Sequence, residues 1–150
     1  MNTLRLHIRN YRKGDFPAVE KLWLLTDMGG RERGDDEDAI EATLDKGGKL
    51  LILEIKETGE IVGTSWLTND GRRIYLHHFA ITPSLQGLGF SKLLLKESLL
   101  FAKQKDLQIK LEVHQTNKKA VSLYKKEGFR YLGDYDIYII REWENNKEQK

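Results

Sequence analysis

The chain of 150 residues contains no cysteine, which excludes disulfide bonds, a thiol nucleophile and any metal site built on cysteine. It also lacks an excess of charge of one sign, because 25 basic residues are balanced by 23 acidic ones. A net charge of only +2 gives no reason to expect nucleic acid as a partner. No apolar run approaches the roughly 18 residues of a membrane span, so no membrane partner is expected either.

Signals for export and for several domains are missing as well. The residues after Met1, Asn2-Thr3-Leu4-Arg5, do not form the apolar core of a signal peptide, so we expect a cytoplasmic protein. Repeats and linkers are absent, which predicts a single domain over residues 1–150 with a frayed polar tail at 144–150. With 39% apolar and 32% charged residues, the composition is typical of a soluble globular domain large enough to bury a core.

The first half of the chain has the patterns of one strand, two helices and three further strands. Alternation from Leu6 to Tyr11 predicts the first strand. Asp15 is a good N-cap and Pro17 suits a first turn, so a helix is expected there that ends at Met28-Gly29-Gly30. Acidic residues predict the start of a second short helix, Asp36 to Asp45. Antiparallel strands joined by tight turns are expected at Leu50–Ile55, Ile61–Leu67 and Ile74–Ile81.

A glycine-containing stretch, Ile81 to Ser91, stands between the last of these strands and a strongly helical segment. Gly87 and Gly89 allow unusual backbone angles and the close approach of a ligand. The first N–H groups of the following helix have no partner within it and lie at the positive end of its dipole. Strand, turn and helix start together predict a phosphate-binding loop. Gly-Lys-Ser/Thr is absent, which excludes a Walker-type loop, and the full GxGxxG dinucleotide fingerprint is absent too.

The second half continues with alternating helices and strands. A helix is predicted from Leu93 to Lys105, and a strand from Ile109 to Val113 that pairs in parallel through a right-handed crossover. Asn117 is placed to cap the next helix, Lys118 to Lys126, which Gly128 ends. A final pair of strands is expected at Phe129–Leu132 and Tyr135–Ile140. Because the last of these is apolar enough to be a liability at an open edge, we expect a homodimer.

The stretch from Gln86 to Ser91 resembles the Arg/Gln-x-x-Gly-x-Gly/Ala loop of the GNAT superfamily of N-acetyltransferases. Ser91 stands where the superfamily has Gly or Ala, and it is still small. Downstream residues are similar to the same superfamily's Leu-x-Val, Asn-x-x-Ala and Tyr-x-x-x-Gly-Phe pattern, namely Leu111, Val113, Asn117, Ala120, Tyr124, Gly128 and Phe129. The resemblance is specific over residues 74–132 and concerns only the element order before that.

The resemblance implies an α/β fold with a mixed, mostly antiparallel sheet, a splayed parallel pair of strands and helices on both faces. Acetyl-CoA would lie in the opening between the splayed strands, and no metal is expected. The pantetheine arm would pair with the backbone of Phe79, Ala80 and Ile81. The pyrophosphate would be held by the backbone of the loop, which comprises Gln86, Gly87, Leu88, Gly89, Phe90 and Ser91. Asn117 is also a candidate contact for the pantetheine arm or a bound water.

The chemistry of amine acetylation requires further groups. A lysine-type amine has a pKa of about 10.4 and must lose a proton before it attacks, while the leaving thiolate needs one. Tyr124 lies where the superfamily places its general-acid tyrosine, although the same residue could simply pack its ring on an amphipathic helix. His78 and His77 are candidate bases, expected on opposite sides of their strand, with Glu112 and His114 on the next one. Histidines in strands are also common structural residues, and water can relay the proton instead.

We therefore expect an acetyl-CoA-dependent N-acetyltransferase acting on a primary amine of a small molecule or peptide. The alternative is a non-catalytic acyl-CoA-binding sensor or interaction module on the same fold. The charged run at 31–38 has two interpretations as well. It is either a solvated helix start or a mobile loop over the acceptor site, whose carboxylates attract a cationic amine.

Overall fold

The computed structural model describes residues 4–143. Five strands form one sheet in the order β1-β2-β3-β4-β5. They are β1 (Leu6–Asn10), β2 (Lys49–Ile55), β3 (Ile61–Asn69), β4 (Arg73–Ile81) and β5 (Gln108–Leu111). The first four pair antiparallel, and β5 pairs parallel to β4. This mixed sheet confirms the predicted fold class.

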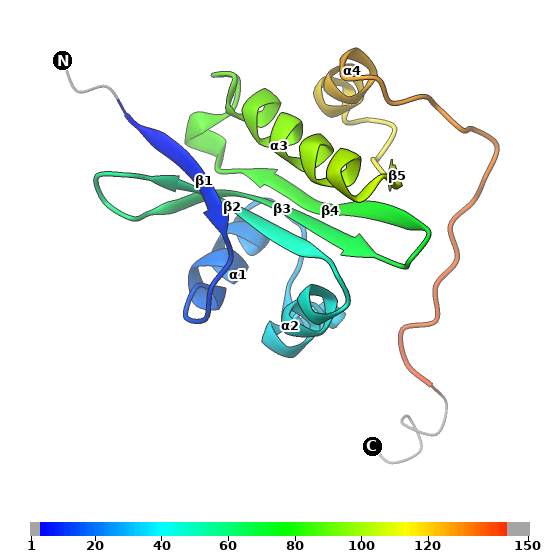
Figure 1. Ribbon diagram of the computed structural model, residues 1–150, viewed down its shortest axis with the longest axis horizontal. Coiled ribbons are helices and arrows are strands. Elements are labelled where there is room, and N and C mark those ends of the chain that lie inside the picture. Colours follow the sequence, from blue (N-terminus) through cyan, green and yellow to red (C-terminus); the bar gives the residue numbers. More distant parts are fainter. Residues whose placement is uncertain (1–3, 144–150) are drawn as a thin grey trace.

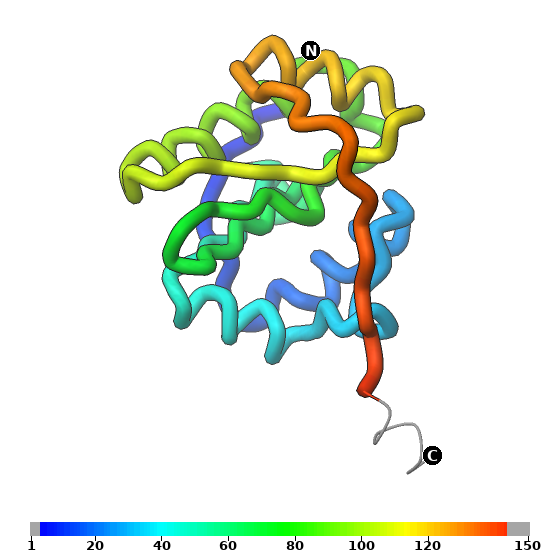
Figure 2. The backbone as a smooth tube through the Cα atoms, turned by 90° about the vertical axis from the view of Figure 1, so that its right-hand side faces the viewer, coloured from blue at the N-terminus to red at the C-terminus, as the bar shows by residue number. Residues whose placement is uncertain are grey.

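Helices cover both faces of the sheet (Figures 1 and 2). Two lie on one face, α3 (Phe90–Lys105) and α4 (Lys118–Lys126), and two on the other, α1 (Phe16–Leu25) and α2 (Glu37–Asp45). Short 3₁₀ turns, η1 (Arg31–Arg33) and η2 (Pro83–Leu85), precede α2 and α3. Within residues 4–143 no helix has the length and apolarity to span a membrane. We refer below to the α3/α4 face and the α1/α2 face.

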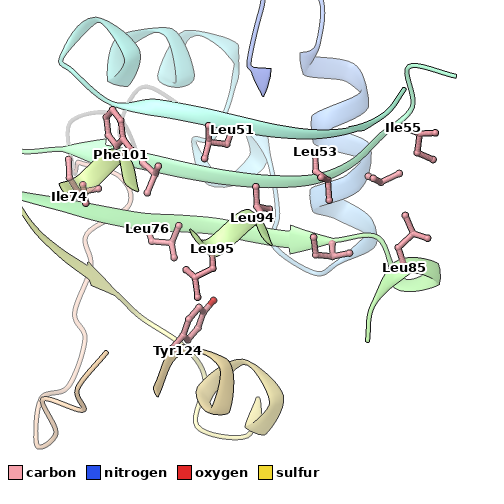
Figure 3. Close-up of a cluster of buried hydrophobic side chains, with 14 residues drawn as sticks. Leu51, Leu53, Ile55, Ile74, Leu76, Leu85, Leu94, Leu95, Phe101 and Tyr124 are labelled. Atoms are coloured by element: carbon pink, nitrogen blue, oxygen red, sulfur yellow. The ribbon is translucent and has the colours of Figure 1, made fainter. Parts of the chain in front are cut away.

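The central strands are buried on both sides, so their side chains alternate between two cores. Leu51 and Leu53 of β2 point to the α3/α4 face, and Leu50 and Ile52 point to the α1/α2 face. The first core is mainly aliphatic, with leucines of α3 and Tyr124 of α4 packed on the sheet (Figure 3). The second core is richer in aromatic rings, including Phe16, Trp23 and Trp66.

Three of the helix starts were anticipated from the sequence, but one is built differently. Asn117 caps α4 as predicted, through the N–H of Ala120. The predicted start of the second helix at Asp36 is confirmed too, and Asp36 caps α2 by accepting a hydrogen bond from the N–H of Ala39 at 2.8 Å. Asp15 occupies the N-cap position of α1 without making the capping hydrogen bond. Its carboxylate is instead held by the Arg9 guanidinium at 2.8 and 3.0 Å. An ionic contact to β1 therefore replaces the expected cap.

The sheet opens between β4 and β5. Their pairing runs from Arg73 and Gln108 to Leu76 and Leu111 and then stops, two residues before the predicted end of β5. On the other side of β4 the register with β3 shifts, because two residues of β4 lie opposite Ser65 alone. One of them, His78, has a positive φ of 43°, which is uncommon for a residue other than glycine.

The last part of the described chain contains no strand. The prediction of strands at 129–132 and 135–140 is wrong for this structure, because residues 129–143 form neither a strand nor a helix. The turn that ends α4 reaches only to Phe129, whose N–H donates to the carbonyl of Tyr124. Figures 1 and 2 show this C-terminal segment leaving α4 and running away past the sheet without joining it. Strand formers such as Tyr138 and Ile139, 88% and 67% exposed, have no neighbouring strand with which to pair. The predicted frayed tail at 144–150 lies outside the described residues.

Candidate functional site

The turn after β4 presents a row of free backbone donors. None of the N–H groups from Gly87 to Lys92 donates to an acceptor in residues 4–143. Gln86 differs, because its N–H donates to the carbonyl of Pro83 and its side chain donates to the carbonyl of Ile81 at 2.9 Å. Gln86 thus folds the turn back on the end of β4, and the donors that follow it point to solvent at the start of α3.

Two glycines give this turn its shape. Gly87 and Gly89 have φ values of 79° and 91°, in the left-handed region that favours glycine. A Cβ atom built on either residue would meet no other atom within 4 Å. The space beside the loop is therefore open at both glycines, as the close approach of a phosphate to this backbone requires.

A groove lined with lysines lies beside the same loop, between the starts of α3 and α4. Its volume is about 490 Å³. The lining residues are Lys92, Lys118, Lys119, Ser122, Leu123, Lys126 and Glu127. Four ammonium groups against one carboxylate favour an anionic ligand at this place. This groove was not predicted from the sequence, although Lys118 and Lys119 directly follow the capping residue Asn117.

The predicted pantetheine-binding residues of β4 lie along the opening of the sheet. Phe79, Ala80 and Ile81 come after the last residue that pairs with β5, so their strand has a free edge on that side. The Phe79 ring packs on the α3/α4 face, 6.1 Å from the ring centre of Tyr124. The opening is therefore bounded by a free strand edge and by an aromatic ring from α4.

Tyr124 is buried, with 8% of its surface exposed, and its ring contacts Phe79 and Phe129 edge-on. Figure 3 shows the ring projecting from α4 toward Leu95 with its hydroxyl foremost. Burial raises the pKa of Tyr124 to about 12. The hydroxyl is thus protonated at neutral pH and available as a hydrogen-bond donor.

The two histidines of β4 are on one side of the strand. The rings of His77 and His78 both contact Trp66, so the prediction that they face opposite sides is wrong. The bulge at His78 is the physical cause, because one extra residue interrupts the alternation of side chains. His77 lies 2.9 Å through Nε2 from Oγ1 of Thr68, and burial is the main factor that lowers its pKa.

His78 has more unusual surroundings. Its ring packs 4.2 Å from Trp23 and 5.4 Å from Trp66, measured between ring centres. The Thr64 hydroxyl donates a hydrogen bond to the backbone carbonyl of His78 at 2.8 Å. The same hydroxyl accepts a hydrogen bond from the indole N–H of Trp23, also at 2.8 Å. Nε2 of His78 is buried without an aligned hydrogen bond, yet it lies 3.2 Å from Oδ2 of Asp35.

The structure separates the other candidates from this group. Glu112 and His114 lie beyond the end of β5 and are exposed, and Nδ1 of His114 contacts Thr116 rather than the opening. Asp35 was not singled out from the sequence, because nothing local distinguishes it from the neighbouring acidic residues. Over the part of the chain that the structure describes, no three His, Asp or Glu side chains gather as potential metal ligands.

Residues 16–129 match the acetyltransferase (GNAT) family. An acetyltransferase of Pectobacterium atrosepticum is 32% identical over 124 residues, which make up 81% of this chain and 85% of the relative. The fold is similar to a GNAT-family acetyltransferase of Staphylococcus aureus, with a TM-score of 0.78, 20% identity, and 89% and 90% of the two chains covered. A GNAT-family acetyltransferase of Elizabethkingia anophelis, solved with acetyl-CoA bound, has a TM-score of 0.60 and 23% identity over 83% of this chain and 76% of its own.

Proposed function

The chain belongs to the acetyltransferase (GNAT) family, and on that premise we propose that it transfers the acetyl group of acetyl-CoA to a primary amine of a small molecule or peptide. The observation that carries this proposal is the row of free N–H groups from Gly87 to Lys92 at the start of α3. Such a row binds the oxygens of a pyrophosphate without any side chain. The lysine-lined groove beside it supplies positive charge for a further phosphate of the cofactor.

In this proposal the acyl arm follows the free edge of β4 at Phe79, Ala80 and Ile81. The thioester then comes within the opening beside Tyr124, whose role is to stabilise and protonate the leaving sulfur. A thiol has a pKa of about 8.5, whereas the buried Tyr124 hydroxyl has one of about 12. Full transfer of a proton from this hydroxyl to a free thiolate would be uphill. Tyr124 therefore donates a hydrogen bond as the charge develops, and passes a proton on only when it receives one.

Asn117 keeps two roles in this proposal. Its side chain caps α4 through the N–H of Ala120, at 3.3 Å, and this role needs no ligand. The same exposed position at the start of α4 also lies beside the lysine groove, so contact with the cofactor is compatible with capping.

The test is the release of CoA thiol from acetyl-CoA in the presence of a panel of primary amines, with calorimetry of CoA binding alongside. We expect CoA to bind with micromolar affinity, about −8 kcal/mol, in the presence of a chelator. Thiol release that requires one class of amine would support the enzyme. CoA binding without thiol release for any amine would favour the sensor or interaction module instead, and no binding at millimolar CoA would refute both.

We also propose that two copies of the chain pair through their C-terminal segments. Within residues 4–143, β5 is an edge strand with no neighbour beyond it, and the segment carries large apolar side chains that are at least two-thirds exposed. These include Tyr131, Leu132, Tyr135, Ile137, Tyr138, Ile139 and Ile140. The open edge of β5 would be covered when the apolar C-terminal segment of a second copy adds to it as a further strand.

Light scattering at high protein concentration tests this pairing. We expect the dimer mass for the wild-type chain and the monomer mass for Ile137→Lys/Ile139→Lys, with Leu24→Lys on the exposed side of α1 as a control that stays dimeric. A monomer mass for the wild type would refute the pairing, whether or not the segment folds back on β5 of its own chain.

A further inference from the structure

The environment of His78 is the strongest unexplained feature of the structure. A non-glycine residue with φ of 43° in the middle of a strand is strained, and its buried Nε2 has no aligned hydrogen bond. Strain and unsatisfied buried groups of this kind occur where function requires them, and each needs an explanation. The geometry points to Asp35 and His78 as the pair that takes the proton from the acceptor amine, an inference that rests on the proposed function.

His78 is at the right place for this step. Leu76 is the last residue of β4 that pairs with β5, and His78 comes two positions after it. The next residue is Phe79, where the acyl arm is proposed to begin. The His78 ring lies on the α1/α2 face against Trp23 and Trp66, opposite the face that carries Tyr124. An amine that enters from the α1/α2 side would therefore meet His78 on one side of the thioester and Tyr124 on the other.

Asp35 is held firmly, although it lies between two short elements. Its N–H donates to the carbonyl of Gly30 at 3.1 Å, and the next residue, Asp36, caps α2. The turn into this position needs Gly34, whose φ is 88°. The Asp35 side chain remains 27% exposed and has Oδ2 3.2 Å from Nε2 of His78. A carboxylate at this distance favours the tautomer with hydrogen on Nε2, which leaves the lone pair on Nδ1.

His77 does not fit the same role. Its Nε2 is 2.9 Å from Oγ1 of Thr68, and no carboxylate forms an ion pair with it among the described residues. The ring also stacks against Tyr75, with 6.0 Å between ring centres. The structure therefore distinguishes two histidines that the sequence left equivalent.

The proton movements balance as follows. The bound ammonium group gives one proton to Nδ1 of His78, and the resulting imidazolium is stabilised by the Asp35 carboxylate. The lone pair of the amine attacks the thioester carbon, the C–N bond forms, and the C–S bond breaks with its electron pair on sulfur. A second proton from the nitrogen reaches that sulfur through the Tyr124 hydroxyl, and the first proton leaves His78 for water.

Kinetics of single and double variants test the pair. His78→Gln should lower kcat by about 10²-fold, the usual contribution of a general base, and Asp35→Asn by about 10-fold. Both should leave the CoA affinity from calorimetry unchanged, and Asp35→Glu should recover part of the loss. Because the two residues act as a unit, the double variant should be no slower than His78→Gln alone. Asp38→Asn, an exposed acid in the first turn of α2, is the matched control for the loss of one negative charge.

The acceptor supplies a second readout. With an amine that is already neutral at the assay pH, no ammonium proton has to be removed, so the loss in both variants should shrink. Equal losses for strongly and weakly basic amines would overturn the role in proton removal. Normal turnover of Asp35→Asn, or losses that multiply in the double variant, would overturn the pair while leaving the acetyltransferase in place. A wild-type chain that releases no thiol would overturn the proposed function, and the proton-accepting role with it.

Discussion

The two faces of β4 are built on different principles. On the α3/α4 face, an aliphatic core and free backbone N–H groups form the proposed cofactor site, and Tyr124 is the only buried titratable side chain on that face among the described residues. On the α1/α2 face, aromatic rings, a hydroxyl and a carboxylate from distant parts of the chain surround His78. The proposed cofactor side thus depends on main-chain geometry, which tolerates many side chains. The proposed acceptor side depends on particular side chains, so we expect substitutions there to change the choice of acceptor.

Gly89→Val should produce the largest effect, confined to the cofactor side. The branched side chain at φ of 91° strains the loop and fills the space in front of the free N–H groups. We expect CoA binding to weaken by on the order of 10³-fold, from micromolar to undetectable at millimolar concentration by calorimetry. Gly71→Val is the matched control, since Gly71 also has a positive φ, 84°, and open space, but lies in the β3–β4 turn. Similar melting temperatures with normal CoA binding in both variants would place the phosphate site elsewhere.

Tyr124→Phe should lower the turnover rate while the cofactor affinity stays near that of the wild type. The substitution removes only the hydroxyl and keeps the ring packed between Phe79 and Phe129. Because the hydroxyl acts as a donor more than as an acid, we expect a loss at the low end of the about 10²–10⁴-fold range for proton transfer catalysis. The loss should also shrink for an acyl donor with a more acidic leaving thiol.

Tyr131→Phe, at an 82% exposed position, controls for the removal of a tyrosine hydroxyl. Unchanged turnover of Tyr124→Phe at saturation would make Tyr124 a packing residue. A joint fall in CoA affinity and melting temperature would instead show a structural hydrogen bond and support the sensor.

Removing two lysines of the groove should have a smaller effect on the cofactor side. Exposed ion pairs are each worth about 0.2–1 kcal/mol, so Lys118→Ala/Lys119→Ala should weaken CoA binding by about 3- to 10-fold. The loss should be absent for dephospho-CoA, which lacks one phosphate, and should diminish at high salt. Lys103→Ala/Lys105→Ala, at the opposite end of α3, serves as the control. Equal losses for both ligands in calorimetry would mean that the groove does not bind that phosphate.

The effect on cofactor binding and turnover should be smallest for Glu54→Gln, which instead tests, through protein stability, how the α1/α2 face is anchored. Glu54 accepts hydrogen bonds from Arg9, which also binds Asp15 at the start of α1, and these bonds lower the pKa of Glu54 to about 2. A pKa lowered in the folded state adds stability above the ordinary value of 4.5, and this stability is lost as the pH falls toward about 2. We expect Glu54→Gln to reduce the free energy of unfolding by about 1–3 kcal/mol at pH 6.

Urea denaturation at pH 6 and pH 3 measures this effect, and the difference between the two should be smaller in the variant than in the wild type. Hydrogen exchange should show faster exchange in α1 than in α3. The exposed Glu97→Gln on α3 is the control. An unchanged pH dependence in Glu54→Gln would contradict the anchoring role.

The same contrast explains which features the sequence could predict. The glycine loop, the start of α2 at Asp36, the cap at Asn117 and the order of the first nine elements depend on neighbours in the chain, and the structure contains them. The two final strands were predicted wrongly because strand propensity cannot supply a hydrogen-bonding partner. The contact between Asp35 and His78 brings together a loop residue and a strand residue that are far apart in the sequence, so no local sequence pattern predicts it.

The bulge at His78 also determines on which face of the sheet each side chain of β4 lies. Before it, Tyr75 and His77 belong to the α1/α2 face, and after it Phe79 and Ile81 belong to the α3/α4 face, although all four have odd numbers. Deleting His78 would remove the bulge and leave the other side chains on their present faces, whereas deleting a residue elsewhere in β4 would turn every side chain on one side of the deletion to the opposite face. No substitution can reproduce that change. The length of β4, and not only its composition, is therefore under the constraint of the site.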